Sequence, residues 1–248
     1  MPPESPQPSE SPESREDTGS SPPGPVISLD DPRALQILST EHWSLLSARS
    51  LAYNEAFTRG GMFLSFLSMS FVALALLAQG MSFDREFLII AAVVLAFDLI
   101  IGLTTYGRII GANADDLRAV HGMSRIRHGY TQIAPMTTPY FTTGTHDDPA
   151  GVMISYGSPP TTYPGVIFYA LTTSGGMIAL IVALVGGVLV GVLSLIFGAS
   201  AGAAIALSIV GAIVACVLEM ALTAGSVAKV SENLPVLFPS ESEGEPKA

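Results

Sequence analysis

Residues 177–224 read MIALIVALVGGVLVGVLSLIF GAS AGAAIALSIVGAIVACVLEMALTA, two apolar stretches separated by the three-residue turn Gly198-Ala-Ser200. Each stretch is as long as the roughly 20 residues that an α-helix needs to cross a bilayer. Residues 149–218, which include the first stretch and most of the second, contain no Asp, Glu, Lys or Arg. The stretch predicts two antiparallel transmembrane helices, because so short a turn leaves consecutive helices side by side.

A second pair of apolar stretches lies earlier in the chain, at 62–79 and 87–107, joined by the turn 80–86. The sequence therefore predicts an all-α membrane protein with two transmembrane helical hairpins, four spans in all. Only 13% of the 248 residues are charged, about half the share of a soluble domain. This composition excludes an ordinary soluble enzyme and a DNA-binding domain, and the single cysteine, Cys216, excludes an intrachain disulfide.

Composition divides the chain into six parts. These are a disordered Pro/Ser/Glu-rich tail (1–30), a juxtamembrane helix (31–60), the first hairpin (61–107), a cytoplasmic segment (108–165), the second hairpin (166–226) and a flexible acidic tail (227–248). Asp31-Pro32 is a typical helix start, with a capping side chain followed by a first-turn proline. The helix that follows is expected to lie near the membrane surface before the chain turns inward, with Glu55 and Arg59 paired at i,i+4.

The segment 108–165 is the part outside the membrane with the most polar and aromatic residues. Residues 108–133 are expected to extend the second span as a helix, and the Pro- and Thr-rich sequence after Pro135 predicts short turns. Asp148-Pro149 predicts the start of a short helix that Gly157 ends. Arg125 and Arg127 are expected to meet acidic headgroups or Asp115 and Asp116.

The basic residues predict the orientation of the chain. One side of the spans has only Arg85, and the other side has seven: Arg49, Arg59, Arg108, Arg118, Arg125, Arg127 and Lys229. The positive-inside rule then places both termini and the middle segment in the cytoplasm.

Two acidic residues lie within the predicted spans. Asp98 is about eleven residues into the second span, near the bilayer centre at about 1.5 Å per residue, where acids face other helices and often have a function. Two interpretations remain open: a protonated Asp98 hydrogen-bonded to Ser65, Ser68 or Gln79 of the first span, or a group that carries protons or cations. Glu219 lies nearer the inner end of the fourth span, and its expected partner is Arg108, in a structural ion pair.

Small residues recur at helical spacing along the last two spans, and such ridges let helices approach closely. They predict close packing within the second hairpin, with homo-oligomerisation through the same ridge as the alternative. The residues are Gly187, Gly191, Ser194 and Gly198 on the third span, and Ala204, Ser208, Gly211 and Ala215 on the fourth.

The histidines do not predict a metal site. His121 and His128 are seven residues apart, and the run His146-Asp147-Asp148 has no ligand spacing typical of a known centre. No nucleophile–base pair and no Gly-rich phosphate loop is present either. We therefore expect no enzymatic activity, no cofactor, no metal and no nucleic-acid partner.

Several strings together resemble an uncharacterised family of actinobacterial integral membrane proteins. They are LQILSTEHWSLLSARS (35–50), YNEAFTRGGMF (53–63), GMSRIRHGY (122–130), PYF (139–141) and HDDPAG (146–151). The resemblance covers roughly residues 33–155. It implies a multi-pass protein of the bacterial cytoplasmic membrane and no particular activity.

Two functional hypotheses remain. The first is a non-enzymatic protein that binds a cytoplasmic partner or anchors an assembly, because the polar and aromatic residues of 41–43 and 113–155 have no membrane-spanning purpose. The second is a small oligomeric channel or a proton- or cation-coupled carrier that uses Asp98, which needs oligomers because four spans are few for a carrier.

Overall fold

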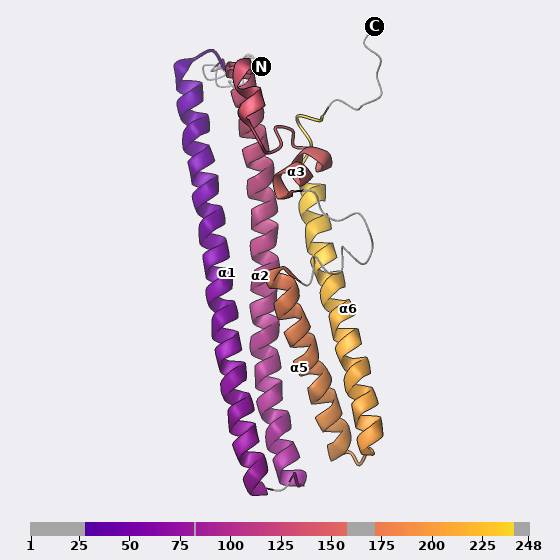
Figure 1. The fold of residues 1–248 in the computed structure, drawn as a ribbon. Helices are drawn as coiled ribbons and strands as arrows, with labels where there is room; N and C mark the ends of the chain where they lie inside the picture. The colour runs from indigo at the N-terminus through magenta and orange to yellow at the C-terminus, as the bar shows by residue number, and fades with distance from the viewer. Residues whose placement is uncertain (1–27, 82, 158–171, 241–248) are drawn as a thin grey trace, which may run out of the picture.

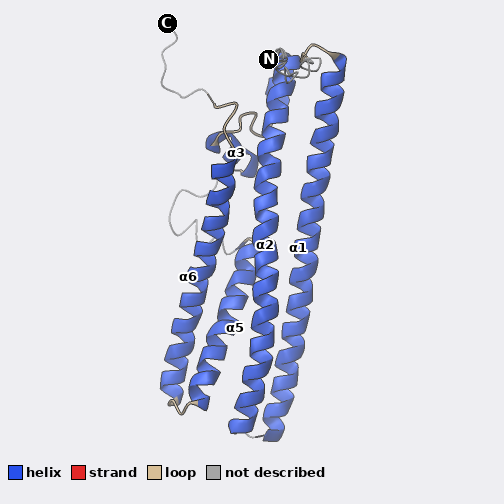
Figure 2. Ribbon diagram, turned by 180° about the vertical axis from the view of Figure 1, so that it is seen from behind, coloured by secondary structure: helices blue, strands red, loops and turns tan. Residues whose placement is uncertain are grey.

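Four long helices form the molecule in the computed structural model, which describes residues 28–81, 83–157 and 172–240. The elements are α1 (Pro32–Met81), α2 (Arg85–Ile133), the 3₁₀-helix η1 (Pro135–Tyr140), α3 (Pro149–Tyr156), α5 (Ser174–Ile196) and α6 (Ala201–Asn233). The described part contains helices and loops and no strand (Figure 2). All four long helices are long and apolar enough to cross a membrane, so the predicted all-α membrane fold is confirmed.

The helices stand in a row in the order α1, α2, α5, α6, and both tight turns lie at the same end of the molecule (Figure 1). Polar side chains start the helices as expected from the sequence. The Asp31 carboxylate accepts from the backbone N–H of Arg33 at 2.9 Å, and Asp84 accepts from Phe87 at the start of α2. Gly198, with a φ of +89°, ends α5 in a left-handed conformation that costs little for glycine.

The apolar core lies where α2 packs between α1 and α5. Its buried residues are Ala56, Phe63 and Leu67 of α1, Leu95, Tyr106, Ile109 and Ala112 of α2, and Ile178, Val182 and Val185 of α5. Large apolar side chains on the outside of the spans stay exposed, such as Phe97 (64%) and Leu218 (59%). That distribution suits a protein whose spans contact lipid, because lipid tails are as apolar as leucine.

α1 and α2 continue far beyond the apolar spans as one straight pair (Figure 1). The extension of α2 to Ile133 confirms the helix expected there, and at 1.5 Å per residue it reaches about 39 Å past residue 107. The expected turn between a surface helix and the first span is wrong, because α1 is continuous from Pro32 to Met81. No Pro interrupts it after its first turn, so the helix has no reason to break. We call residues 32–60 of α1 and 108–133 of α2 the stalk.

The outer end of the stalk carries the shorter elements. η1 and α3 provide the short turns expected after Pro135, with the Asp148 cap and Gly157 at the ends of α3 as predicted. The flexible tail expected at 227–248 is wrong for its first part, since α6 continues to Asn233 and residues 234–240 are hydrogen-bonded to the stalk side. The tail 1–27, residues 158–165 and residues 241–248 lie outside the described residues.

Gly102 on α2 tests the packing of the core. A Cβ there would lie 2.8 Å from Val182 and 3.0 Å from Phe63, so Gly102→Leu should lower the free energy of unfolding by about 1–3 kcal/mol through overpacking. Gly107→Leu on the same helix is the control, because no atom lies within 4 Å of a Cβ there. Equal destabilisation by both variants, measured by unfolding in detergent, would contradict this packing.

Candidate functional site

Asp98 lies at the contact between α1 and α2 and is only 3% exposed. The Ser70 hydroxyl donates to Asp98 Oδ1 at 2.9 Å, while Oδ2 is buried and has no hydrogen-bond partner among the described residues. The expected partners Ser65, Ser68 and Gln79 are wrong. Each of the three donates to a carbonyl four residues earlier in α1, because the register of the hairpin brings Ser70 to the height of Asp98.

Glu219 is buried on α6, and neither of its carboxylate oxygens has a hydrogen-bond partner among the described residues. Its backbone carbonyl accepts from the Tyr106 hydroxyl at 3.0 Å. The expected ion pair with Arg108 is wrong. Arg108 donates to Glu55 of α1 at 2.7 and 3.1 Å, because it lies about 200° around α2 from Tyr106 and therefore points away from α6.

The Glu55 carboxylate also accepts from Arg59 at 3.1 Å, as the i,i+4 spacing predicted. These two arginines lower the pKa of Glu55 below its usual value, the Arg108 hydrogen bond most of all. The three side chains join α1 to α2 at the end of the spans, where charged groups still reach water or headgroups.

The ridge of small residues on α5 packs against α6. A Cβ on Gly187 would lie 2.5 Å from the carbonyl oxygen of Ser208, and one on Gly191 would lie 3.2 Å from that of Ala204. Across the contact, a Cβ on Gly211 would lie 3.2 Å from Val190.

The other predicted members of the ridge have different surroundings. Ser194 donates to the Gly191 carbonyl of its own helix, and Ala215 lies at the edge, near Gly186. Gly198 is in the turn, where a Cβ would meet no atom within 4 Å, so its place in the packing ridge is a wrong prediction. The ridge around Gly187 and Gly191 is thus occupied within the chain and is not free for a second copy.

An ionic cluster holds α3 against the stalk. Asp116 of α2 is 2% exposed and receives hydrogen bonds from Arg49 of α1 and from the Tyr156 hydroxyl of α3, the latter at 2.7 Å. Burial and the nearby carboxylate raise the pKa of Tyr156, so it stays a protonated donor. The expected pairing of Arg125 and Arg127 with Asp115 and Asp116 is wrong.

Arg118, one turn along α2, binds Asp115 at 2.7 Å instead. Arg127 donates to the Gly144 carbonyl at 3.3 Å, and Arg125 binds Asp147. Arg49 and Asp116 are 67 positions apart in the sequence, and Arg125 and Asp147 are 22 apart. Neither ion pair could be predicted from spacing along one helix.

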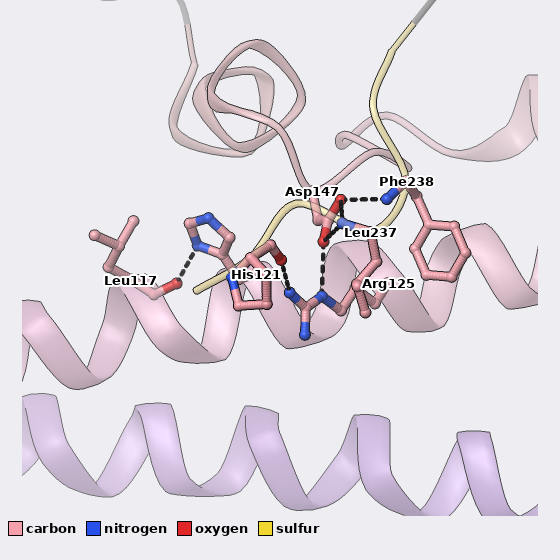
Figure 3. A network of polar contacts seen from close by, with 7 residues as sticks. Leu117, His121, Arg125, Asp147, Leu237 and Phe238 are labelled. Carbon is pink, nitrogen blue, oxygen red and sulfur yellow. Dashed lines mark hydrogen bonds and ion pairs between the residues drawn. The ribbon is translucent and has the colours of Figure 1, made fainter. Parts of the chain in front are cut away.

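Asp147 holds the C-terminal segment 234–240, and we call this arrangement the C-terminal clasp (Figure 3). Its fully buried carboxylate accepts from Arg125 at 2.7 Å and from the backbone N–H groups of Leu237 and Phe238 at 2.7–3.1 Å. Arg125 also donates to the carbonyl of Pro235. Burial by itself raises the pKa of Asp147, but these hydrogen bonds outweigh it and hold the pKa below the ordinary value.

Two further contacts complete the clasp. Asp148, besides capping α3, accepts from the backbone N–H of Ser240 at 3.0 Å. The ring of Phe238 stacks on His128, with 4.2 Å between the ring centroids. Asp147 and Asp148 therefore bind a segment of the chain. Within the described residues no group of three His, Cys, Asp or Glu side chains could hold a metal ion.

An apolar groove of about 620 Å³ lies at the end of the stalk. Its lining residues are Leu35 and Ser39 of α1, Tyr130 and Ile133 of α2, and Ala134, Thr137, Tyr140 and Phe141 around η1. Tyr140 and the neighbouring Met136 are 82% and 85% exposed. The sequence shows the aromatic residues of this region but does not predict a groove, because the walls come from segments about a hundred residues apart.

No protein family, curated protein or solved structure matches the chain in comparisons of its sequence and structure.

The C-terminal clasp predicts a local effect of Asp147→Asn. Loss of the charge weakens the hydrogen bonds from Leu237 and Phe238 by about 1–3 kcal/mol, so their amide hydrogens should exchange roughly ten- to a hundredfold faster. Asp115→Asn is the control, because an exposed ion pair contributes little. Hydrogen exchange followed by mass spectrometry measures the effect, and unchanged protection of residues 234–240 would show that Asp147 does not hold the segment.

Acid should have the same effect on the clasp as the substitution. The pKa of Asp147 is lower in the folded protein than its ordinary value of 3.8. Its stabilising contribution is therefore complete above the unfolded pKa of about 4 and is lost as the pH falls through the folded pKa. We expect the protection factors of residues 237–238, each taken relative to the intrinsic exchange rate at the same pH, to fall below about pH 4 in the native protein, and to fall less in Asp147→Asn.

Proposed function

We propose that the protein is a non-enzymatic scaffold of the bacterial cytoplasmic membrane, which binds a cytoplasmic protein at the end of its stalk. The observation that carries this proposal is the exposed aromatic groove about 39 Å beyond the spans, at 1.5 Å of helix per residue. A span needs no such extension, and exposed aromatic groups far from lipid are typical of protein interfaces.

The construction of the stalk supports this role. Buried ionic contacts fix α3 and the C-terminal segment to α2, through Asp116 and Asp147. A rigid support lowers the entropy lost on binding, because the groove is already formed before the partner arrives.

The orientation is part of the same proposal. The seven basic residues that flank the spans lie on the side of the stalk, and only Arg85 lies at the opposite turns. The positive-inside rule supports a cytoplasmic stalk with both termini on that side. The resemblance of residues 33–155 to an actinobacterial family of membrane proteins supports a bacterial cytoplasmic membrane.

A photo-crosslinking amino acid in place of Met136 tests the proposed binding site in living cells. It should capture a discrete cytoplasmic protein, and Tyr140→Ala should weaken the capture, because truncating an aromatic anchor costs about 2 kcal/mol, roughly thirtyfold in affinity. Tyr140 is mostly exposed, so the truncation should leave the fold intact.

Met153→Ala is the control for this experiment. Met153 lies on α3 on the same side of the membrane, is 43% exposed and does not line the groove. Equal capture in Tyr140→Ala and Met153→Ala, or no captured protein in the parent chain, would argue against partner binding at the groove.

A second function is favoured by the two buried carboxylates. Asp98 Oδ2 and both oxygens of Glu219 lie inside the helix bundle without hydrogen-bond partners in the described structure. Intramembrane acids of this kind mark proton or cation pathways in many membrane proteins. The alternative is therefore a proton- or cation-coupled carrier or channel, which needs more than one copy of a four-span chain to enclose a pathway.

Flux into liposomes that contain the purified protein distinguishes this function. If the carboxylates carry protons or cations, Asp98→Asn and Glu219→Gln should abolish the flux, because an amide neither takes up nor releases a proton in the physiological range. Glu86→Gln, in the first turn of α2, the helix that contains Asp98, should leave the flux unchanged. Flux no greater than in empty liposomes, or flux unchanged in both amide variants, would exclude the carrier function.

A further inference from the structure

The groove at the end of the stalk lies beside the point where the N-terminal part of the chain joins α1. Leu35 and Ser39, which line the groove, belong to the first two turns of the helix. The backbone N–H of Asp31 donates to the carbonyl of Ser28 at 3.0 Å, and such a turn keeps its two ends within about 7 Å of each other. The residues that precede Ser28 therefore join the described structure next to the groove.

The sequence that joins α1 at this point is uncharged and rich in proline. Residues 18–29 read TGSSPPGPVISL, with prolines at 22, 23 and 25 followed by the apolar pair Val26-Ile27. The five acidic residues of 1–29 all come earlier, at positions 4, 10, 13, 16 and 17, and so does Arg15. We call residues 18–27 the proline-rich segment. It differs from the residues before it in having no charge.

The groove has the same uncharged character, and one of its walls is aromatic. None of its eight lining residues is charged. Tyr130 stacks on Phe141 with 6.4 Å between the ring centroids, and on His42 with 6.0 Å, so these rings are held in place before a ligand arrives. Aromatic-lined grooves bind proline-rich peptides, because the polyproline II conformation of such peptides is already formed and loses little entropy on binding.

We propose that the proline-rich segment binds in the groove of its own chain. Pro25 is three residues before Ser28, about 9 Å at 3.1 Å per residue of polyproline II, and Pro22 is about 19 Å away. A groove whose nearest wall is formed by Leu35 lies within this reach. Attachment over so short a distance gives the segment an effective concentration of the order of millimolar, so contacts of micromolar affinity suffice to fill the groove.

Other hollows on the stalk suit the proline-rich segment less well. The one around Leu46, Arg49 and Tyr53 is lined by α1 alone and contains a charged side chain. It starts about 17 Å farther along the helix than Leu35, at 1.5 Å per residue. The groove at the end of the stalk has walls from α1, α2 and η1, and three walls cover more of a peptide than the face of a single helix does.

Binding within the chain closes the groove to other ligands. A cytoplasmic protein that binds there must displace the proline-rich segment, and in this respect alone the inference rests on the proposed function. The contact between the segment and the groove itself requires no partner.

A photo-crosslinking amino acid in place of Met136 tests the contact in the purified full-length protein in detergent, with no partner present. Irradiation should link position 136 to residues 18–27, and the product should keep the 25.8 kDa mass of a single chain. Mass spectrometry of the digested protein identifies the linked peptides. Changing Pro22, Pro23 and Pro25 together to Ala should lower the yield several-fold, because the preformed polyproline II conformation is lost.

Two controls distinguish a bound segment from one that only collides with the groove. Changing Pro6, Pro8 and Pro12 together to Ala removes the same number of prolines from the charged part of the N-terminal sequence, and it should leave the yield unchanged. The same photo-crosslinking amino acid in place of Met153, which is 43% exposed on α3 and does not line the groove, should give little product with residues 18–27.

Four results would overturn the proposal: no link to residues 18–27, a yield that the change of Pro22, Pro23 and Pro25 leaves unaltered, an equal yield from position 153, or a product of twice the single-chain mass. The last would show that the segment binds in the groove of a second copy. Because the purified protein contains no partner, failure to capture a protein in cells would contradict the proposed function and leave this contact standing.

Discussion

The antiparallel pairing of α1 with α2 is the interaction on which the rest of the structure depends. The two helices keep one register along their whole length, so successive residues toward the N-terminus of α1 lie beside successive residues toward the C-terminus of α2. It brings Ser70 to Asp98 in the membrane, Glu55 to Arg108 at its edge and Arg49 to Asp116 in the stalk. The polar contacts follow from this register. A slip of one residue would turn them by about 100° around the helix, leaving buried charged groups without partners.

The pair α1–α2 passes from lipid in the spans to water in the stalk, and the polarity of its side chains changes accordingly. In the spans, the backbone must satisfy its own hydrogen bonds because lipid offers none, and most outward-facing side chains are apolar. In the stalk, carboxylates and guanidinium groups pair across elements that are far apart in the sequence. Asp116 and Asp147 are both buried there, and each receives several hydrogen bonds, which is what the burial of a charge requires.

The C-terminal clasp couples the two hairpins outside the membrane. In the spans, α5 packs on α2 in the core and the Tyr106 hydroxyl of α2 donates to the Glu219 carbonyl of α6. After Asn233 the chain returns to α2 through Asp147 and Arg125. The second hairpin is therefore attached at two heights. This arrangement restricts its tilt relative to the stalk and gives the stalk end a fixed shape. Among the described elements, the others gather on the α2 side of α1 (Figure 1).

The sequence by itself determined the four spans, the helical extension of α2 and the capping of α3 by Asp148, because each depends on neighbouring residues and on the length of apolar stretches. Only the tertiary structure decided the partners of Asp98, Arg108 and Asp147. Amino-acid composition places a charge within an element but does not reveal the register between helices or the return of a distant segment. The sequence was compatible with a continuous α1, because it contains no helix breaker after the first turn. A turn was expected only because the first part of the helix was assumed to lie on the membrane surface. Which polar side chains pair between α1 and α2 depends on the register of the two helices, and packing along their full length determines that register.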